Sequence, residues 1–234
     1  MFAYGIIILL VGIALLGGVL FIVTALHRRF GAPYALLTVG IITYVLSLIV
    51  QIAMLQIIDR ALLSILPVGA LALGLTAGFS EETARLLGYQ YLARGAATKA
   101  QALMIGAGHG ISETVYTALV AAALGLSLMG YDTTRPDDLA ALVSGALAEA
   151  CNGLLPIVMH MALSWIVLQA FLRGELYWLF VAIFAHAVTE IMAALLGPSD
   201  AWIVVAWRAL IAIISLVVMT RLTPPTVESS HPST

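Results

Sequence analysis

The chain has 234 residues, of which 62% are hydrophobic and 9% are charged, and its mean hydropathy is +1.10. A water-soluble domain carries about 25% charged residues, so the composition excludes a soluble fold and makes lipid the main solvent. The formal net charge of −2 and the absence of a basic patch argue against nucleic acid as a partner. The single cysteine, Cys151, excludes an intrachain disulfide framework.

The N-terminal segment is apolar over more than the 20 or so residues that cross a bilayer. It lacks the basic start and the small-residue cleavage site of a signal peptide, so we expect a retained membrane helix. Seven apolar segments are predicted as spans. They are Phe2–Leu26, Tyr34–Ile58, Leu62–Gly78, Gln101–Met129, Leu139–Leu172, Leu176–Leu196 and Ala201–Arg221.

Two of these segments have special features. The third is expected to continue as a helix through SEETARLLGYQYLAR into the membrane interface. The fifth is interrupted by Pro156, which removes a backbone donor and predicts a kink. The fold class is therefore an all-α polytopic membrane bundle, with one domain over residues 1–221. The short, proline-rich segment 222–234 is expected to be a disordered cytoplasmic tail.

Basic residues near the ends of the spans indicate the orientation. With the N-terminus outside and the C-terminus inside, seven basic residues fall at cytoplasmic ends and two fall outside, as the positive-inside rule requires. The seven are Arg28, Arg29, Arg85, Arg94, Lys99, Arg173 and Arg221, and the two are Arg60 and Arg135.

Ten ionisable residues remain at membrane depth, where each costs about 2.5–3.5 kcal/mol to insert unpaired. They are Glu81, Glu82, Arg85, His109, Glu113, Glu149, His160, His186, Glu190 and Arg208. Such residues must face the bundle interior, pair with one another or line a wet cavity. For Arg208 we expect a structural pair with an acid on a neighbouring helix.

Residues four apart share a helix face, so spacing predicts which of these side chains lie together. Arg85 follows Glu81 by four residues and Glu82 by three, and it is placed to hold one of these carboxylates ionised. Two His-x-x-x-Glu pairs, His109–Glu113 and His186–Glu190, project from separate helices.

The fifth span carries a polar stripe. Glu149, Asn152, Pro156 and His160 recur at offsets of 3, 7 and 11. Depth estimates at 1.5 Å per residue bring the glutamates of the third span and the three histidines into one cavity in the inner half of the bundle. Glycines around His109 (Gly106, Gly108 and Gly110) are expected to admit a neighbouring helix or a substrate backbone.

Carboxylates beside imidazoles are suited to the activation of water. A glutamate takes a proton from water, which attacks a carbonyl, while a histidine stabilises the oxyanion or protonates the leaving amine. Alternatively, three histidines (His109, His160 and His186) and a glutamate hold a zinc ion that lowers the pKa of its bound water. The chain has no His-Glu-x-x-His motif, and the residues leave both the zinc and the metal-free glutamate mechanism open.

Three motifs in this order resemble the YhfC-type family of intramembrane metalloproteases. They are Glu-Glu-x-x-Arg at the end of one span, Gly-His-Gly-x-x-Glu in the next, and a late His-x-x-x-Glu, and together they cover roughly residues 78–190. The resemblance extends to the superfamily of type II CAAX prenyl endopeptidases and bacteriocin-processing enzymes. The PrsW proteases and the Aph subunit of γ-secretase are similar in core architecture.

The resemblance implies that Glu81 is the general base, that Glu82 is its partner, and that His109 and His186 complete the site. Arg85, Glu113, Glu149, His160 and Glu190 are the supporting residues. CAAX-type enzymes usually have Glu-Glu-x-x-x-Arg, and often asparagine at the position of Glu190. These departures argue against prenyl peptides as the substrate.

We therefore expect a peptidase that acts on a membrane protein or lipopeptide in a bacterial cytoplasmic membrane. Two alternatives stay open at this stage. One is a non-catalytic scaffold that resembles the Aph subunit, and the other is a proton- or metal-coupled transporter, because intramembrane Glu and His chains also serve proton relays. Against a transporter, no convincing inverted repeat is visible. The oligomeric state is not determined by the sequence.

Overall fold

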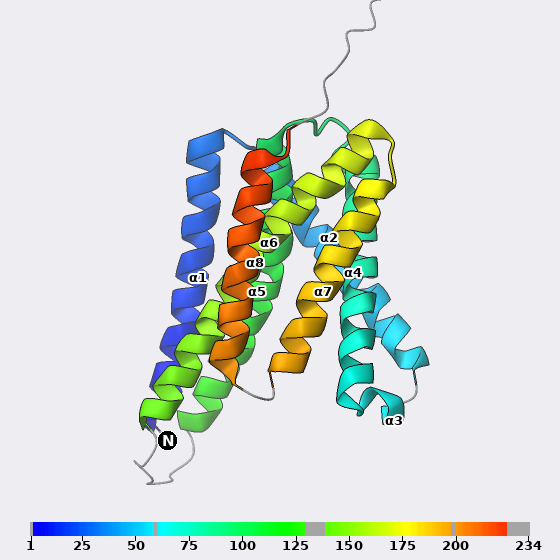
Figure 1. Ribbon diagram of the computed structural model, residues 1–234. Coiled ribbons are helices and arrows are strands. Elements are labelled where there is room, and N and C mark those ends of the chain that lie inside the picture. Colours follow the sequence, from blue (N-terminus) through cyan, green and yellow to red (C-terminus); the bar gives the residue numbers. More distant parts are fainter. Residues whose placement is uncertain (1, 59, 130–138, 198–199, 224–234) are drawn as a thin grey trace, which may run out of the picture.

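The computed structural model describes residues 2–58, 60–129, 139–197 and 200–223, and every regular element within them is an α-helix (Figure 1). The helices in chain order are α1 (Phe2–Phe30), α2 (Ala35–Ile57), α3 (Arg60–Leu63), α4 (Leu66–Tyr91), α5 (Lys99–Met129), α6 (Leu139–Arg173), α7 (Tyr177–Leu196) and α8 (Ala201–Arg221). The predicted tail falls almost entirely on 224–234, outside the described residues, and so does Arg135.

Five helices are long and apolar enough to cross a membrane, which makes the chain a multi-pass membrane protein. They are α1, α2, α6, α7 and α8. The other two predicted spans correspond to α4 and α5, of 26 and 31 residues, which carry Glu81, Glu82, Arg85, His109 and Glu113. The two less apolar helices thus bring half of the ten ionisable side chains at membrane depth into the bundle.

The long helices run alternately up and down, so that neighbours in sequence are mostly antiparallel (Figure 1). Helix α6 is the central element, because 72% of its most apolar window is buried against 22–33% in the other four apolar helices. It continues through Pro156 and crosses the bundle obliquely, from the end shared by α1 and α5 to the start of α7. Around it, α1 packs on α5, α4 packs on α7, and α2 contacts both α4 and α5.

The third predicted span begins later than expected. A separate short helix, α3, occupies Arg60–Leu63, and α4 starts at Leu66 with Pro67 in its first turn. Proline lacks a backbone donor and is favoured at that position, where the donor has no helical partner, so Pro67 explains the new start. At its other end α4 continues to Tyr91, so the predicted helical extension is present except for its last three residues.

The outer surface of the bundle is apolar. Large side chains such as Phe21, Ile57, Phe180 and Phe184 are 64–86% exposed. A soluble monomer rarely exposes contiguous apolar surface on this scale, whereas lipid tails solvate it. The basic residues Arg28, Arg29, Arg173 and Arg221 lie in the last turns of α1, α6 and α8, which end on the side of the bundle opposite the N-terminus (Figure 1). Arg85 is fully buried inside the bundle.

Glycines let the helices that carry the polar side chains touch backbone to backbone. A Cβ atom added at Gly74 or Gly78 of α4 would lie 2.7 Å and 2.6 Å from the carbonyl oxygens of Ala187 and Ile183 in α7. Added at Gly106 of α5, it would lie 2.4 Å from the carbonyl oxygen of His160 in α6. This close packing of small residues is how membrane helices associate without a hydrophobic driving force. The glycines near His109 therefore admit neighbouring helices, one of the two roles predicted for them.

The Gly78→Ala variant is expected to be less stable by about 1–3 kcal/mol, because the new methyl group meets the α7 backbone, which cannot yield as a side chain would. Thermal unfolding in detergent measures the effect. Gly145→Ala in α6 is the matched control, since nothing lies within 4 Å of its added Cβ. Helix propensity alone favours alanine there by about 1 kcal/mol. A Gly78→Ala protein as stable as the control would show that the α4–α7 contact is loose.

Candidate active site

Four helices bring seven ionisable side chains together inside the bundle, and this set is called the Glu/His cluster. Its members are Glu81, Glu82 and Arg85 of α4, His109 and Glu113 of α5, His160 of α6 and His186 of α7. The predicted gathering of the α4 glutamates with the three histidines is present in the structure. The rings of His109 and His160 are 4.9 Å apart between centroids, and those of His160 and His186 are 5.2 Å apart.

Glu81 lies at the centre of the cluster. Its Oε2 atom is 2.7 Å from Nε2 of His109 and 3.7 Å from Nε2 of His186, so two histidines from different helices face one carboxylate oxygen. The Glu81 side chain is 12% exposed, whereas both histidines are buried. Glu81 is therefore the member of this trio whose side chain is partly exposed.

Glu82 is held in a fully buried ion pair with Arg85, one helical turn further along α4. The other oxygen of its carboxylate, Oε1, is 2.7 Å from Nδ1 of His186 and accepts a hydrogen bond from that ring. A carboxylate that binds one nitrogen of a histidine fixes the orientation of the ring and leaves the other nitrogen for chemistry. The chain Arg85–Glu82–His186 thus aims Nε2 of His186 toward Glu81.

The Arg85→Met variant is expected to lose about 3–5 kcal/mol of stability, because it leaves the Glu82 carboxylate buried without its guanidinium partner. Thermal unfolding measures the loss, and Arg94→Met, which changes an exposed arginine beyond the end of α4, is the control. The double variant Glu82→Gln/Arg85→Met should recover part of the lost stability, since the uncompensated charge is gone. An Arg85→Met protein as stable as the Arg94 control would contradict a stabilising buried pair.

His160 links the two parts of the cluster. Nη2 of Arg85 lies 3.2 Å from its Nδ1, and an arginine can only donate, so Nδ1 is the acceptor. The hydrogen of the neutral ring is then on Nε2, which lies 3.1 Å from Oε2 of Glu113. Both nitrogens of His160 are engaged by protein groups in this arrangement.

The Arg85–Glu82 pair follows the predicted spacing within α4, whereas the histidines pair between helices. The spacing placed His109 beside Glu113 and His186 beside Glu190. In the structure His109 contacts Glu81, while Glu113 bonds His160. Each histidine therefore bonds a carboxylate on another helix, and these bonds tie α4, α5, α6 and α7 together.

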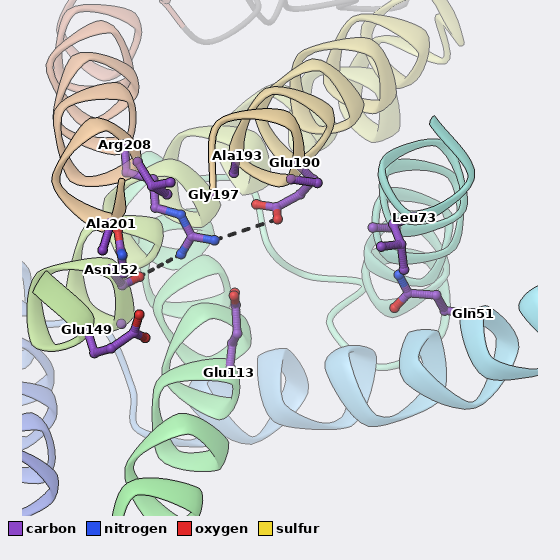
Figure 2. Close-up of a pocket in the computed structure, with 14 residues that line it drawn as sticks. Gln51, Leu73, Glu113, Glu149, Asn152, Glu190, Ala193, Gly197, Ala201 and Arg208 are labelled. Carbon is purple, nitrogen blue, oxygen red and sulfur yellow. Dashed lines mark hydrogen bonds and ion pairs between the residues drawn. The ribbon is translucent and has the colours of Figure 1, made fainter. Parts of the chain in front are cut away.

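A cavity of about 470 Å³ adjoins the cluster on the side of the bundle where α7 ends and α8 begins (Figure 2). Glu113 belongs to both, because it lines the cavity and bonds His160. Glu149 and Glu190 line the same space from α6 and α7. Glu149 and Asn152 here, with His160 in the cluster, trace the polar stripe predicted along α6.

Arg208 of α8 reaches into this cavity and pairs with an acid, as predicted. Its Nη2 is 3.7 Å from Oε2 of Glu190, and its Nη1 donates to the backbone oxygen of Asn152 at 2.6 Å (Figure 2). The Nε atom of Arg208 and Oδ1 of Asn152 are buried with no protein hydrogen-bond partner. Water or a bound polar group would satisfy them.

Two residues of α2 belong to the site although the sequence did not single them out. The hydroxyl of Thr43 lies 3.2 Å from Nδ1 of His109, and the Tyr44 ring meets the same imidazole edge-on at 5.3 Å. Threonine and tyrosine are common inside apolar spans, so their type carries no signal. Only the packing of α2 against α5 reveals them.

The donor set is compatible with a metal ion. One ligand atom each from Glu81, His109 and His160 can be chosen so that all three lie within 4.8 Å of one another. A carboxylate with two imidazoles matches catalytic zinc sites, which use three protein ligands and leave a position for water. The set agrees with the predicted combination of histidines and a glutamate, except that His186 is not among its members.

Comparison with known proteins gives one match. A family model described as YhfC intramembrane metalloprotease matches residues 8–214, which is most of the chain and includes the Glu/His cluster and the lining of the cavity. No curated protein and no solved structure matches the chain.

Proposed function

The chain belongs to the YhfC intramembrane metalloprotease family, and we propose that it hydrolyses a peptide bond with a water molecule activated by Glu81. The observation that carries this proposal is the position of Glu81, whose Oε2 atom faces His109 and His186 from two other helices. Ionisable groups are costly to place at membrane depth, and those that occur there commonly mark functional sites.

Glu81 is proposed as the general base. Both histidines contact Oε2, so Oε1 is the oxygen that accepts a proton from water. The hydroxide equivalent then forms a bond to the carbonyl carbon of the substrate, and the C–N bond breaks as the same proton is delivered to the leaving nitrogen. General base catalysis of this type is worth about 10²- to 10⁴-fold in rate.

His186 is proposed to stabilise the oxyanion. The Glu82 carboxylate, neutralised in turn by Arg85, accepts the Nδ1 hydrogen and would stabilise the ring when it is protonated on both nitrogens. Nε2 is then a donor aimed at the space beside Glu81, where the carbonyl oxygen gains charge. Preorganised donors in a dry site are a large source of catalysis.

Glu81, His109 and His160 are the residues that would hold a zinc ion. When bound, zinc supplies a Lewis acid that polarises a carbonyl and lowers the pKa of coordinated water. His160 can join such a site only if it turns from Arg85 or Glu113, because both of its nitrogens are engaged.

The cavity is the proposed substrate site. Its volume of about 470 Å³ is in the range of small-ligand pockets, and its shared residue Glu113 connects it with the cluster. An extended peptide or lipopeptide segment that enters between α7 and α8 would reach Glu81 from there. The buried and unpartnered polar atoms of Asn152 and Arg208 are suited to bind its backbone.

The proposed topology has seven crossings, with the N-terminus outside and the C-terminus in the cytoplasm of a bacterial cell. Support comes from the antiparallel succession of helices and from the basic residues Arg28, Arg29, Arg173 and Arg221 in last turns at one end of the bundle. The cavity would then open toward the outer face.

A comparison of membranes that contain the wild type or Glu81→Gln tests the proposal. Peptides released from membrane proteins and lipopeptides are identified by mass spectrometry, with equal amounts of folded enzyme in both samples. Products that depend on Glu81 support the peptidase. Identical product profiles over a broad search, with loss of a bound partner on mutation of His109, would support the scaffold alternative instead.

A further inference from the structure

Thr43 of α2 is buried against the cluster at a place where neither a charge nor a metal-ligand motif predicts a role. Its side chain is 1% exposed, and its Oγ1 atom lies 3.2 Å from Nδ1 of His109. The contact is set by backbone packing. One turn earlier, a Cβ atom at Gly40 would lie 2.0 Å from the backbone oxygen of Ile105 in α5. The backbones of α2 and α5 are therefore in van der Waals contact, and this packing places Thr43 beside His109.

The direction of the Thr43 hydroxyl decides which nitrogen of His109 carries hydrogen. Oγ1 donates to the backbone oxygen of Gly40 at 2.8 Å, which is shorter than the contact with His109. A hydroxyl has one hydrogen and two lone pairs, so with its hydrogen on Gly40 it presents a lone pair to the imidazole. Nδ1 of His109 must then be the donor in that contact.

A neutral His109 with hydrogen on Nδ1 has its lone pair on Nε2, which is 2.7 Å from Oε2 of Glu81. Two lone pairs at that separation repel, so either a cation lies between them or a proton does, and that proton is on Nε2 whenever Glu81 is ionised to act as the base. The mobile proton, or the metal, is therefore at the Nε2–Glu81 contact and not at Nδ1. A partner on the far nitrogen is how proteins orient histidines that ligate metals or transfer protons.

We propose that Thr43 is a positioning residue that holds His109 in the Nδ1–H form and so keeps its Nε2 lone pair directed at Glu81. Thr43 touches neither substrate nor reacting atoms and acts only through His109. The consequence for catalysis rests on the proposed peptidase function, but the state of the ring does not.

The test uses full-length protein labelled with ¹⁵N-histidine in detergent, in its metal-free form. Hydrogen attachment at each ring nitrogen is read from ¹⁵N shifts and one-bond couplings, and a His109→Asn spectrum assigns the signal among the five histidines of the chain. The wild type is expected to carry hydrogen on Nδ1 of His109. Thr43→Ser should keep this signal, because it retains the hydroxyl. Thr43→Val has nearly the same shape without the hydroxyl and should shift hydrogen to Nε2.

Kinetics provide the second readout. Thr43→Val is expected to lower kcat, or the affinity for zinc, by about 10- to 100-fold with little change in KM, and Thr43→Ser should restore it. A wild-type His109 without hydrogen on Nδ1 overturns the proposal, as does a Thr43→Val protein with the wild-type ring signal. If Thr43→Val does not fold, the wild-type and Thr43→Ser spectra still decide. Because the spectra need no substrate, a failure of the peptidase proposal would not be confused with a failure of this one.

Discussion

The Glu81→Gln variant is expected to lose about 10²- to 10⁴-fold in kcat while the protein stays folded. Glutamine preserves the size of the side chain but cannot accept a proton from water. The Glu81 side chain is partly exposed and is not held by the Arg85 pair that fixes Glu82, so its loss of charge removes no buried ion pair with arginine. The rate is measured with purified enzyme and a substrate found by the membrane comparison, and thermal unfolding reports the fold.

Glu175→Gln is the matched control for this loss. Glu175 is exposed between α6 and α7, where it accepts a hydrogen bond from Trp178, and it lies outside the Glu/His cluster. The control should cleave at the wild-type rate. A folded Glu81→Gln enzyme that also cleaves at that rate would remove Glu81 from the role of base.

Purified wild-type protein is expected to bind about one zinc ion per chain, and His109→Ala is expected to bind none above background. Removal of one of only two imidazoles in the donor set leaves too few ligands for a stable site. Elemental analysis gives the content, and thermal unfolding gives a second measure. Zinc at 100 times its Kd stabilises the wild type by about 2.7 kcal/mol, and a chelator reverses the effect.

His27→Ala separates this site from incidental histidine binding. His27 is in α1, where it bonds the backbone oxygen of Ala32 and stacks on Tyr34, away from the cluster. The control should keep both the zinc and the stabilisation. If the wild type holds no zinc under conditions where it cleaves in a Glu81-dependent way, the zinc assignment is wrong and the metal-free glutamate mechanism stands.

The helices were predictable because their cause is local. An apolar stretch that has to satisfy its backbone in lipid becomes a helix, so the segments found in the sequence recur within a few residues as α1, α2 and α5–α8. The start of α4 was misplaced because Pro67 divides an apolar run that reads as continuous. The full burial of Arg85 follows from its pair with Glu82, which the spacing of three residues predicted.

The membership of the cluster was also predictable, because ionisable residues at membrane depth must pair with one another or face the bundle interior. The Arg85–Glu82 pair was predictable from its spacing within α4, but the partners of the histidines were not. Spacing along one helix says which side chains share a face, but it does not give the rotation of that helix against its neighbours. The contact of His109 with Glu81 of α4 could therefore not be predicted, and Thr43 enters the site because α2 and α5 pack closely at Gly40 and Gly108.

The glycine contacts separate the positioning of the Glu/His cluster from the shape of the adjoining cavity. The helices that carry the Glu/His cluster are registered through main-chain atoms, whereas one wall of the adjoining cavity is made of the small side chains Ala193, Ala194, Gly197 and Ala201. Changes in the size of these wall residues would reshape what the cavity accepts while the main-chain register persists. In related chains, the selectivity of the cavity would then change more readily than the geometry of the Glu/His cluster.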